Sequence, residues 1–242
     1  MQLFIDIDGV LLNFEHSFVR WLNAEYRLGL PEHYEAESWD FTEVLDKREL
    51  EAGWHRYLAS RAAGEMPALV DPVRFNRLVA EHTVHLVTNF PQPHMAKRLS
   101  NLDVLGFTYD SLHYCGLHGY QDVQPRTKAQ VIATLREVRG EGLFVDDHPD
   151  NCVDVHDHCP GVEVWLMSRR FNRGFAHPRI RRAQDWDCLF DRLASGSGGN
   201  GAAGNGSAGD GARGAPADPA AGAQGAAPGV PGLSGAPGPR GR

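Results

Sequence analysis

Apolar and polar positions alternate in different ways along the chain, and the change predicts strands in some segments and helices in others. Residues 2–8 (QLFIDID) are β-prone and alternate, and Gly9 follows at once, which is typical of a buried strand that ends in a turn. Residues 15–27 carry apolar side chains at helical spacing, and 46–62 and 73–81 read as further helices. No strand is predicted between residue 15 and about residue 80.

From residue 84 onward short apolar runs alternate with helical patterns. We predict strands at 84–88, 111–115, 142–147 and 162–167, and helices at 94–102, 127–138 and 185–194. Strands that alternate with helices favour a parallel sheet covered on both faces. The predicted fold class is therefore α/β, a three-layer sandwich with a central parallel sheet and a small helical cap inserted after the first strand.

Composition divides the chain near residue 195. The sequence has 242 residues, and from Ser195 it is dominated by Gly, Ala, Pro, Ser and Asn. Such a segment buries too little apolar surface to offset the entropy of ordering it. We expect an α/β core of residues 1–14 and 81–194, a helical cap of residues 15–80, and a disordered tail of residues 195–242. The glycine spacing at the end of the tail is collagen-like, but low complexity explains so short a run better.

Charge and cysteine content narrow the class of partner. The formal net charge is −7, and no basic face is visible, which argues against a nucleic-acid polymer as partner. No apolar run approaches the length of a membrane span. The chain opens directly with a strand-like run rather than a signal peptide, so we expect a cytoplasmic protein whose four cysteines are reduced.

Polar side chains stand where the predicted strands end, which is where ligands bind in open α/β sheets. They are Asp6 and Asp8, Thr88 and Asn89, and Asp146 and Asp147, with Lys128 at the start of an intervening helix. Carboxylates gathered from two strand ends repel one another unless a cation lies among them. Hard oxygen ligands favour Mg²⁺. We therefore predict a magnesium site made by Asp6, Asp8, Asp146 and Asp147.

The same residues predict phosphoryl-transfer chemistry. Asp6 and Asp8 are two residues apart, so one carboxylate can attack phosphorus while the other exchanges a proton with the leaving group and with water. Thr88, Asn89 and Lys128 can hold the phosphoryl oxygens, on which charge must be stabilised. The expected substrate is a small phosphate ester.

The sequence resembles the haloacid dehalogenase superfamily. The family's four motifs are matched in order by DIDGV (6–10), Thr88 after an apolar strand, Lys128, and the pair Asp146-Asp147, over roughly residues 1–170. The resemblance implies that Asp6 is the nucleophile and Asp8 the acid/base. It also implies that the acids of the last motif, with Asp6 and a backbone carbonyl, hold Mg²⁺.

A narrower resemblance is to the cytosolic type C 5′(3′)-deoxyribonucleotidases and their bacterial relatives. It rests on DIDGVLLNFE (6–15), WDF (39–41) and VDDHPDN (145–151). It implies a nucleotide substrate and aromatic side chains that stack on the base, with Phe14 matching one of them. Trp39 and Phe41 are further candidates.

Other interpretations remain open at this point. The substrate can instead be a sugar phosphate or another small phosphate ester, and a non-catalytic phosphate-binding module can keep the same fold. Halide displacement is less favoured, because it leaves Asp8 with little to do. His148 and Asp150 are candidates for contacts near the metal or the substrate. The runs HYCGLH (113–118) and CVDVHDHC (152–159) lack the paired spacing of a zinc site.

Overall fold

A parallel six-stranded sheet, in the order β3-β2-β1-β4-β5-β6, forms the centre of the protein. The structure is a computed structural model that describes residues 1–116, 125–135 and 141–196. The strands are β1 (Gln2–Ile5), β2 (Thr83–Thr88), β3 (Ser111–Tyr114), β4 (Gly142–Asp146), β5 (Val162–Met167) and β6 (Arg181–Ala183). This order reverses direction between β1 and β4, the point at which ligands bind in doubly wound sheets.

Helices separate the first five strands along the chain, and the one at residues 149–158 was not among those predicted. The helices are α1 (Phe14–Tyr26), α2 (Lys47–Ala59), α3 (Pro72–Glu81), α4 (Met95–Leu105), α5 (Lys128–Leu135), α6 (Pro149–His158) and α7 (Trp186–Gly196), with short 3₁₀ turns η1 (Ala62–Gly64), η2 (Gln92–His94) and η3 (Arg170–Asn172). β1, β2, β4 and β5 are almost wholly buried, as strands covered on both faces must be.

Two apolar clusters account for the two covered faces of the sheet. Leu3 and Ile5 of β1 belong to a cluster that includes side chains of α3 and α7, whereas Phe4, between them, belongs to a cluster with α5 and α6. Alternate residues of a strand point to opposite faces, so helices cover the sheet on both sides. The predicted α/β class with a parallel central sheet is confirmed.

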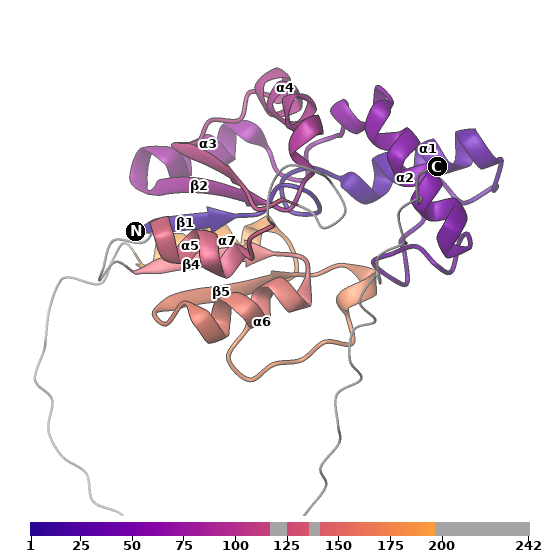
Figure 1. Ribbon diagram of the computed structural model, residues 1–242. Coiled ribbons are helices and arrows are strands. Elements are labelled where there is room, and N and C mark those ends of the chain that lie inside the picture. The colour runs from indigo at the N-terminus through magenta and orange to yellow at the C-terminus, as the bar shows by residue number, and fades with distance from the viewer. Residues whose placement is uncertain (117–124, 136–140, 197–242) are drawn as a thin grey trace, which may run out of the picture. The chain divides into compact units, whose positions relative to one another are not determined.

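The segment between β1 and β2 is helical, and it contains no strand. In Figure 1, α1 and α2 lie beyond the ends of the strands, on the right of the view. Aromatic rings hold these two helices together: Phe18 of α1 lies 5.8 Å from Trp54 and 5.0 Å from Tyr57 of α2, between ring centroids.

α3 lies with the sheet, although the predicted boundary at residue 80 assigns it to the cap. The ring of Phe75 contacts Phe107 and Trp186 at centroid distances of 5.3 and 5.6 Å. The described residues up to 196 also form one compact unit, so the division into a core and a cap stays a prediction. Residues 197–242 of the predicted tail, and 136–138 of a predicted helix, lie outside the described residues.

The helices and the cysteines can be compared with what the sequence predicts. Within the described ranges, no helix combines the length and the apolar character needed to cross a lipid bilayer. None of the four cysteines, all of which are among the described residues, forms a disulfide. Cys152 and Cys159 are buried in the apolar cluster under α5 and α6, where a small apolar side chain packs well.

Candidate metal centre and active site

Three carboxylates meet where the strand order reverses. Asp6 directly follows β1, its backbone N–H donates to the carbonyl of Val145 at 3.0 Å, and Asp146 ends the neighbouring β4. With Asp147 they form a group whose carboxylate oxygens all lie within 4.8 Å of one another. All three residues are buried. We call Asp6, Asp146 and Asp147 the acidic cluster.

The turn after β1 makes room for one member of this cluster. Gly9 has a φ of 79°, in the left-handed region that side chains with a Cβ rarely adopt. Its N–H donates to Leu12 O at 2.8 Å and closes the turn. A Cβ added at Gly9 would lie 2.6 Å from Cγ of Asp147 and nearer still to Oδ2. The Asp147 carboxylate therefore occupies space that only glycine leaves free.

Lys128 is the cation nearest the acidic cluster. It is the first residue of α5, and its Nζ lies 2.6 Å from both Asp6 Oδ1 and Asp146 Oδ2. A cation at a helix start is disfavoured by the helix dipole, and the two carboxylates offset that cost. Burial alone would lower the pKa of Lys128, but Asp146 and Asp6 together hold it above its ordinary value.

The pKa values of two carboxyl groups in the acidic cluster are raised, so these groups bind protons more tightly than isolated carboxylates do. Burial, reinforced by the charges of Asp146 and Asp8 and opposed by Lys128, raises the pKa of Asp6 from 3.8 to about 7. Burial and the neighbouring Asp146 and Asp6 raise the pKa of Asp147 well above its ordinary value. One ammonium group thus leaves the cluster short of positive charge. A divalent cation with hard oxygen ligands would supply it.

Asp146 is held in place from several directions. Nδ2 of Asn151, on α6, donates to its Oδ1 at 3.2 Å and its Oδ2 at 3.1 Å, and the N–H of His148 donates to Oδ1 at 2.8 Å. Hydrogen bonds that orient a ligand in this way are typical of metal centres. Asp150, a candidate from the sequence, is outside the cluster and lies in the first turn of α6.

Two residues after β5 support the same turns, and the sequence analysis did not single them out. Nε of Arg169 donates to the carbonyl of Gly9 at 3.0 Å. Nδ2 of Asn172 donates to the carbonyls of Asp147 and Met167 at 2.7 and 2.8 Å. Both follow the strand at 162–167, so the strand-end rule that selected Asp6 and Asp146 could have found them.

Asp8, the fourth predicted metal ligand, is placed differently from the other three. Asp8 lies outside the acidic cluster; its carboxylate instead pairs with Nε of Arg98 at 2.8 Å. The physical reason is the turn, in which Asp8 forms an isolated bridge with Leu12 and its side chain faces α4. The structure brings together Asp6, Asp146 and Asp147, with Lys128, and leaves Asp8 beside them.

Thr88 is the last residue of β2, the other neighbour of β1, and Asn89 follows it. The Thr88 side chain is buried and its Oγ1 accepts the N–H of Phe90 at 3.2 Å, which leaves the hydroxyl hydrogen available to donate. Oδ1 of Asn89 is buried and has no hydrogen-bond partner among the described residues. Thr88 and Asn89 thus lie at the end of the strand that neighbours β1.

Comparisons with solved structures identify the fold. The chain is similar to a haloacid dehalogenase-like hydrolase from Streptococcus pneumoniae, with 13% identity, a TM-score of 0.53, and coverage of 79% of this chain and 97% of that one. It is also similar to a haloacid dehalogenase-superfamily hydrolase of subfamily IA from Geobacter sulfurreducens, with 16% identity, a TM-score of 0.51, and coverage of 79% and 95%. The fold is that of the haloacid dehalogenase-like hydrolases. No family model and no curated protein matches the sequence.

Within this haloacid dehalogenase-like fold, the predicted base-stacking residues occupy different environments. The Phe14 ring stacks on Phe18 at 5.5 Å, with Trp54 edge-on at 5.6 Å, a packing role that needs no ligand. Phe41 is buried beside the same ring of Phe18 at 5.0 Å. Trp39 differs, because it is 53% exposed.

Trp39 is also the aromatic candidate that contacts a residue next to the acidic cluster. Its ring lies 5.0 Å from the ring of His148, edge to face, and His148 directly follows Asp147. Burial lowers the pKa of His148. Trp39 and His148 therefore form an aromatic pair beside the acidic cluster.

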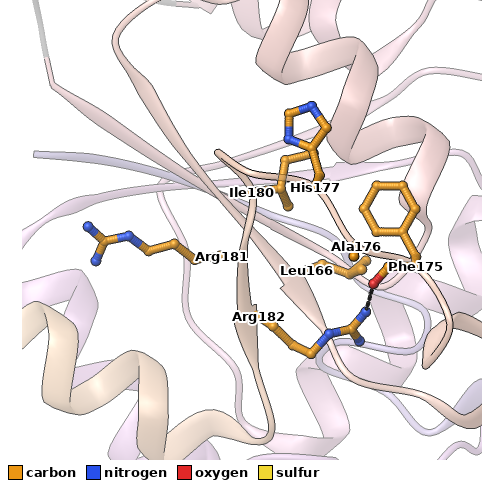
Figure 2. A pocket seen from close by; sticks show the side chains of 7 residues that line it. All are labelled: Leu166, Phe175, Ala176, His177, Ile180, Arg181 and Arg182. Atoms are coloured by element: carbon orange, nitrogen blue, oxygen red, sulfur yellow. Dashed lines mark hydrogen bonds between the residues drawn. The ribbon is translucent and has the colours of Figure 1, made fainter. Parts of the chain in front are cut away.

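A separate cavity lies between β5 and the segment leading into β6 (Figure 2). Its volume is about 220 Å³, and it is lined by Leu166, Phe175, Ala176, His177, Ile180, Arg181 and Arg182. Nη2 of Arg182 donates to the carbonyl of Phe175 at 2.7 Å and closes one wall. None of these residues belongs to the acidic cluster.

Proposed function

We propose that the protein is a magnesium-dependent phosphomonoester hydrolase that acts through an aspartyl-phosphate on Asp6. The observation that carries the proposal is the position of Asp6, at the switch point of the sheet and within the acidic cluster, with Lys128 Nζ 2.6 Å from its carboxylate. A carboxylate so placed is ready to attack an electrophile, and the neighbouring ammonium can stabilise negative charge on a phosphoryl group.

The reaction proceeds in two displacements. A carboxylate oxygen of Asp6 forms a bond to phosphorus, and the ester P–O bond breaks with its electron pair going to the leaving oxygen, which takes a proton from Asp8. Water then attacks phosphorus and gives a proton to Asp8, and the bond between phosphorus and Asp6 breaks. Inorganic phosphate leaves, Asp6 is again a carboxylate, and Asp8 is again a protonated carboxylic acid.

The remaining residues of the centre bind and orient. Thr88 and Lys128 would donate to the phosphoryl oxygens, with Asn89 beside them. Asp6, Asp146 and Asp147 fit Mg²⁺, since they are three carboxylates with too little positive charge around them. The ion, when bound, neutralises charge that develops on the phosphoryl oxygens and orients the group for attack.

We further propose a nucleoside 5′-monophosphate as the substrate. The supporting observation is Trp39, an exposed ring in contact with His148 beside the acidic cluster. Stacking of a base on an aromatic side chain contributes about 1–3 kcal/mol. A sugar phosphate is the alternative substrate, and it would gain nothing from this ring.

The catalytic proposal is tested with Asp6→Asn. The wild-type protein should release phosphate from para-nitrophenyl phosphate only when Mg²⁺ is present, and Asp6→Asn should abolish turnover while the far-ultraviolet circular dichroism stays native. Asp154→Asn, on α6 beside His158, is the matched control and should keep its activity. Turnover in pure Asp6→Asn protein would refute the nucleophile assignment, and its absence in the wild type would favour a binding module.

The substrate proposal is tested with a pair of substrates that differ only in the base. Deoxyribose 5-phosphate and deoxynucleoside 5′-monophosphates should differ about 5- to 150-fold in kcat/KM, which corresponds to the stacking energy. Trp39→Ala should remove that preference and leave the rate on deoxyribose 5-phosphate unchanged. Equal kcat/KM values for the two substrates in the wild type would instead support a sugar phosphate.

A further inference from the structure

Side chains of α4 form hydrogen bonds with the backbone of the segment that joins α1 and α2 to the sheet. Nζ of Lys97 donates to the carbonyls of Leu58 and Ser60 at 2.5 and 2.7 Å. Asn101 accepts the N–H of Met66 at 2.8 Å through Oδ1 and donates to its carbonyl at 3.1 Å through Nδ2. These contacts fix the C-terminal end of α2 and the return segment behind it.

Arg98 lies between these two residues and differs from them in what else it touches. Its Nη1 donates to the carbonyl of Ala63, in η1 of the same return segment. Its Nε pairs with the Asp8 carboxylate, 2.8 Å from Oδ1 and 3.1 Å from Oδ2. One guanidinium therefore joins the segment returning from α2 to the residue proposed as acid and base.

The charged side chain of Arg98 is buried and packs against an aromatic ring. The side chain is 0% exposed, and the guanidinium carbon lies 3.8 Å from the centroid of the Phe90 ring. A buried guanidinium without an anionic partner is costly. Among the described residues, Asp8 is the acidic group within ion-pair distance of Arg98. Arg98 therefore contacts Asp8 from the buried side, and the Asp8 side chain keeps 21% exposure.

We propose that Arg98 is a positioning residue that aims the Asp8 carboxylate at the leaving-group oxygen. The inference rests on the proposed function, since it requires Asp8 to deliver that proton. Arginine suits the task because its planar fork binds a carboxylate and a carbonyl at once, and stacking on Phe90 holds the plane still. A proton donor displaced by about 1 Å loses much of its effect on the rate. Arg98 therefore links the position of the segment returning from α2 to the first chemical step.

Leaving-group dependence tests this link, because only substrates with poor leaving groups need the proton. The value of kcat/KM covers the steps up to departure of the leaving group, so hydrolysis of the aspartyl-phosphate does not enter it. Arg98→Lys and Arg98→Met should lower kcat/KM for an alkyl phosphate such as deoxyribose 5-phosphate about 10²-fold, the usual contribution of general acid catalysis. For para-nitrophenyl phosphate the same variants should lose much less, on the order of a few fold.

Lys97→Met is the matched control, since Lys97 is the neighbouring residue on α4, binds the same segment, and does not touch Asp8. It should lower kcat/KM for both substrates by the same factor. Equal losses on both substrates in the Arg98 variants, or leaving-group selectivity in Lys97→Met, would overturn the inference. Asp8→Asn should show the selectivity; if it does while the Arg98 variants do not, the proposed function stands and the inference falls.

A further variant covers the case in which neither Arg98 variant folds. Phe90→Leu removes the ring beneath the guanidinium and leaves the ion pair with Asp8 intact. It should show the same selectivity in a weaker form, and equal kcat/KM losses on the two substrates would overturn the inference. A wild-type protein that hydrolyses neither substrate would overturn the proposed function and the inference together.

Discussion

Replacing Gly9 with alanine tests the geometry of the metal centre directly. The substitution adds a single methyl group, which would lie 2.6 Å from Cγ of Asp147 and closer to its Oδ2. It also places an alanine at a φ of 79°. The contact involves a carboxylate that belongs to the acidic cluster, so relieving it means moving a proposed metal ligand.

The backbone strain and the clash with Asp147 affect different measurable quantities. Left-handed backbone costs an L-residue about 1–2 kcal/mol, which for a protein of this size lowers the melting temperature by about 2–8 °C. Displacement of a metal-centre carboxylate by a neighbouring group is expected to weaken metal binding about 10- to 100-fold, as changes around ligands do. The strain should therefore appear in stability, and the clash in the Mg²⁺ affinity.

Gly106→Ala provides the control. Gly106 has a φ of 81°, and a Cβ added there meets nothing within 4 Å. It carries the same backbone strain without the clash. Isothermal titration with Mg²⁺ and thermal unfolding in a chelator should show similar losses of stability in both variants, and weakened Mg²⁺ binding in Gly9→Ala alone. If Gly9→Ala binds Mg²⁺ as tightly as Gly106→Ala does, Asp147 is not a ligand and the proposed centre is wrong.

Two further predictions concern the charge balance of the acidic cluster. The pKa of Asp6 is raised from 3.8 to about 7 without metal. Protonation of Asp6 therefore stabilises the folded state fully at pH values below 3.8, and this stabilisation is lost as the pH rises through 7. Mg²⁺ binds the ionised carboxylate, so the increase in melting temperature caused by Mg²⁺ should be larger at about pH 8 than at about pH 5.5; an equal increase at both would contradict it. Lys128→Met removes the shared cation and should cost about 3–5 kcal/mol of unfolding free energy, less at low pH where Asp6 is protonated. Urea unfolding in a chelator measures this, and a loss below about 1 kcal/mol at pH 8 would show that the pairing with Asp6 and Asp146 matters little.

Much of the candidate centre could be predicted because it depends on strand ends. Asp6, Asp146 and Asp147 stand directly after apolar runs, and parallel strands bring their carboxyl ends to one edge of the sheet. Which strands are neighbours is a separate matter. The pairing of β1 with both β2 and β4 decides that these carboxylates meet, and periodicity within a single strand carries no information about it.

The partners of buried polar groups were harder to predict. Residues 94–102 were predicted as a helix, and all but the first of them lie in α4. The pattern does not show that Arg98 points inward to reach Asp8. α3 was likewise predicted as a helix, and its packing beside Phe107 and Trp186 was not. Apolar spacing shows which face of a helix is buried and leaves open what the face is buried against.

The sequence by itself determined the α/β class and the helical insertion after the first strand, and it supplied the acidic residues on which the proposed phosphate and metal chemistry rests. Only the tertiary structure decided that Asp8 turns away from the acidic cluster toward Arg98, and that Trp39 rather than Phe41 is exposed beside it. The physical reason is the separation along the chain of the residues in contact. Local spacing reports the balance of burial and exposure along one segment, whereas these arrangements depend on contacts between residues far apart in the chain, such as the 90 positions that separate Asp8 from Arg98.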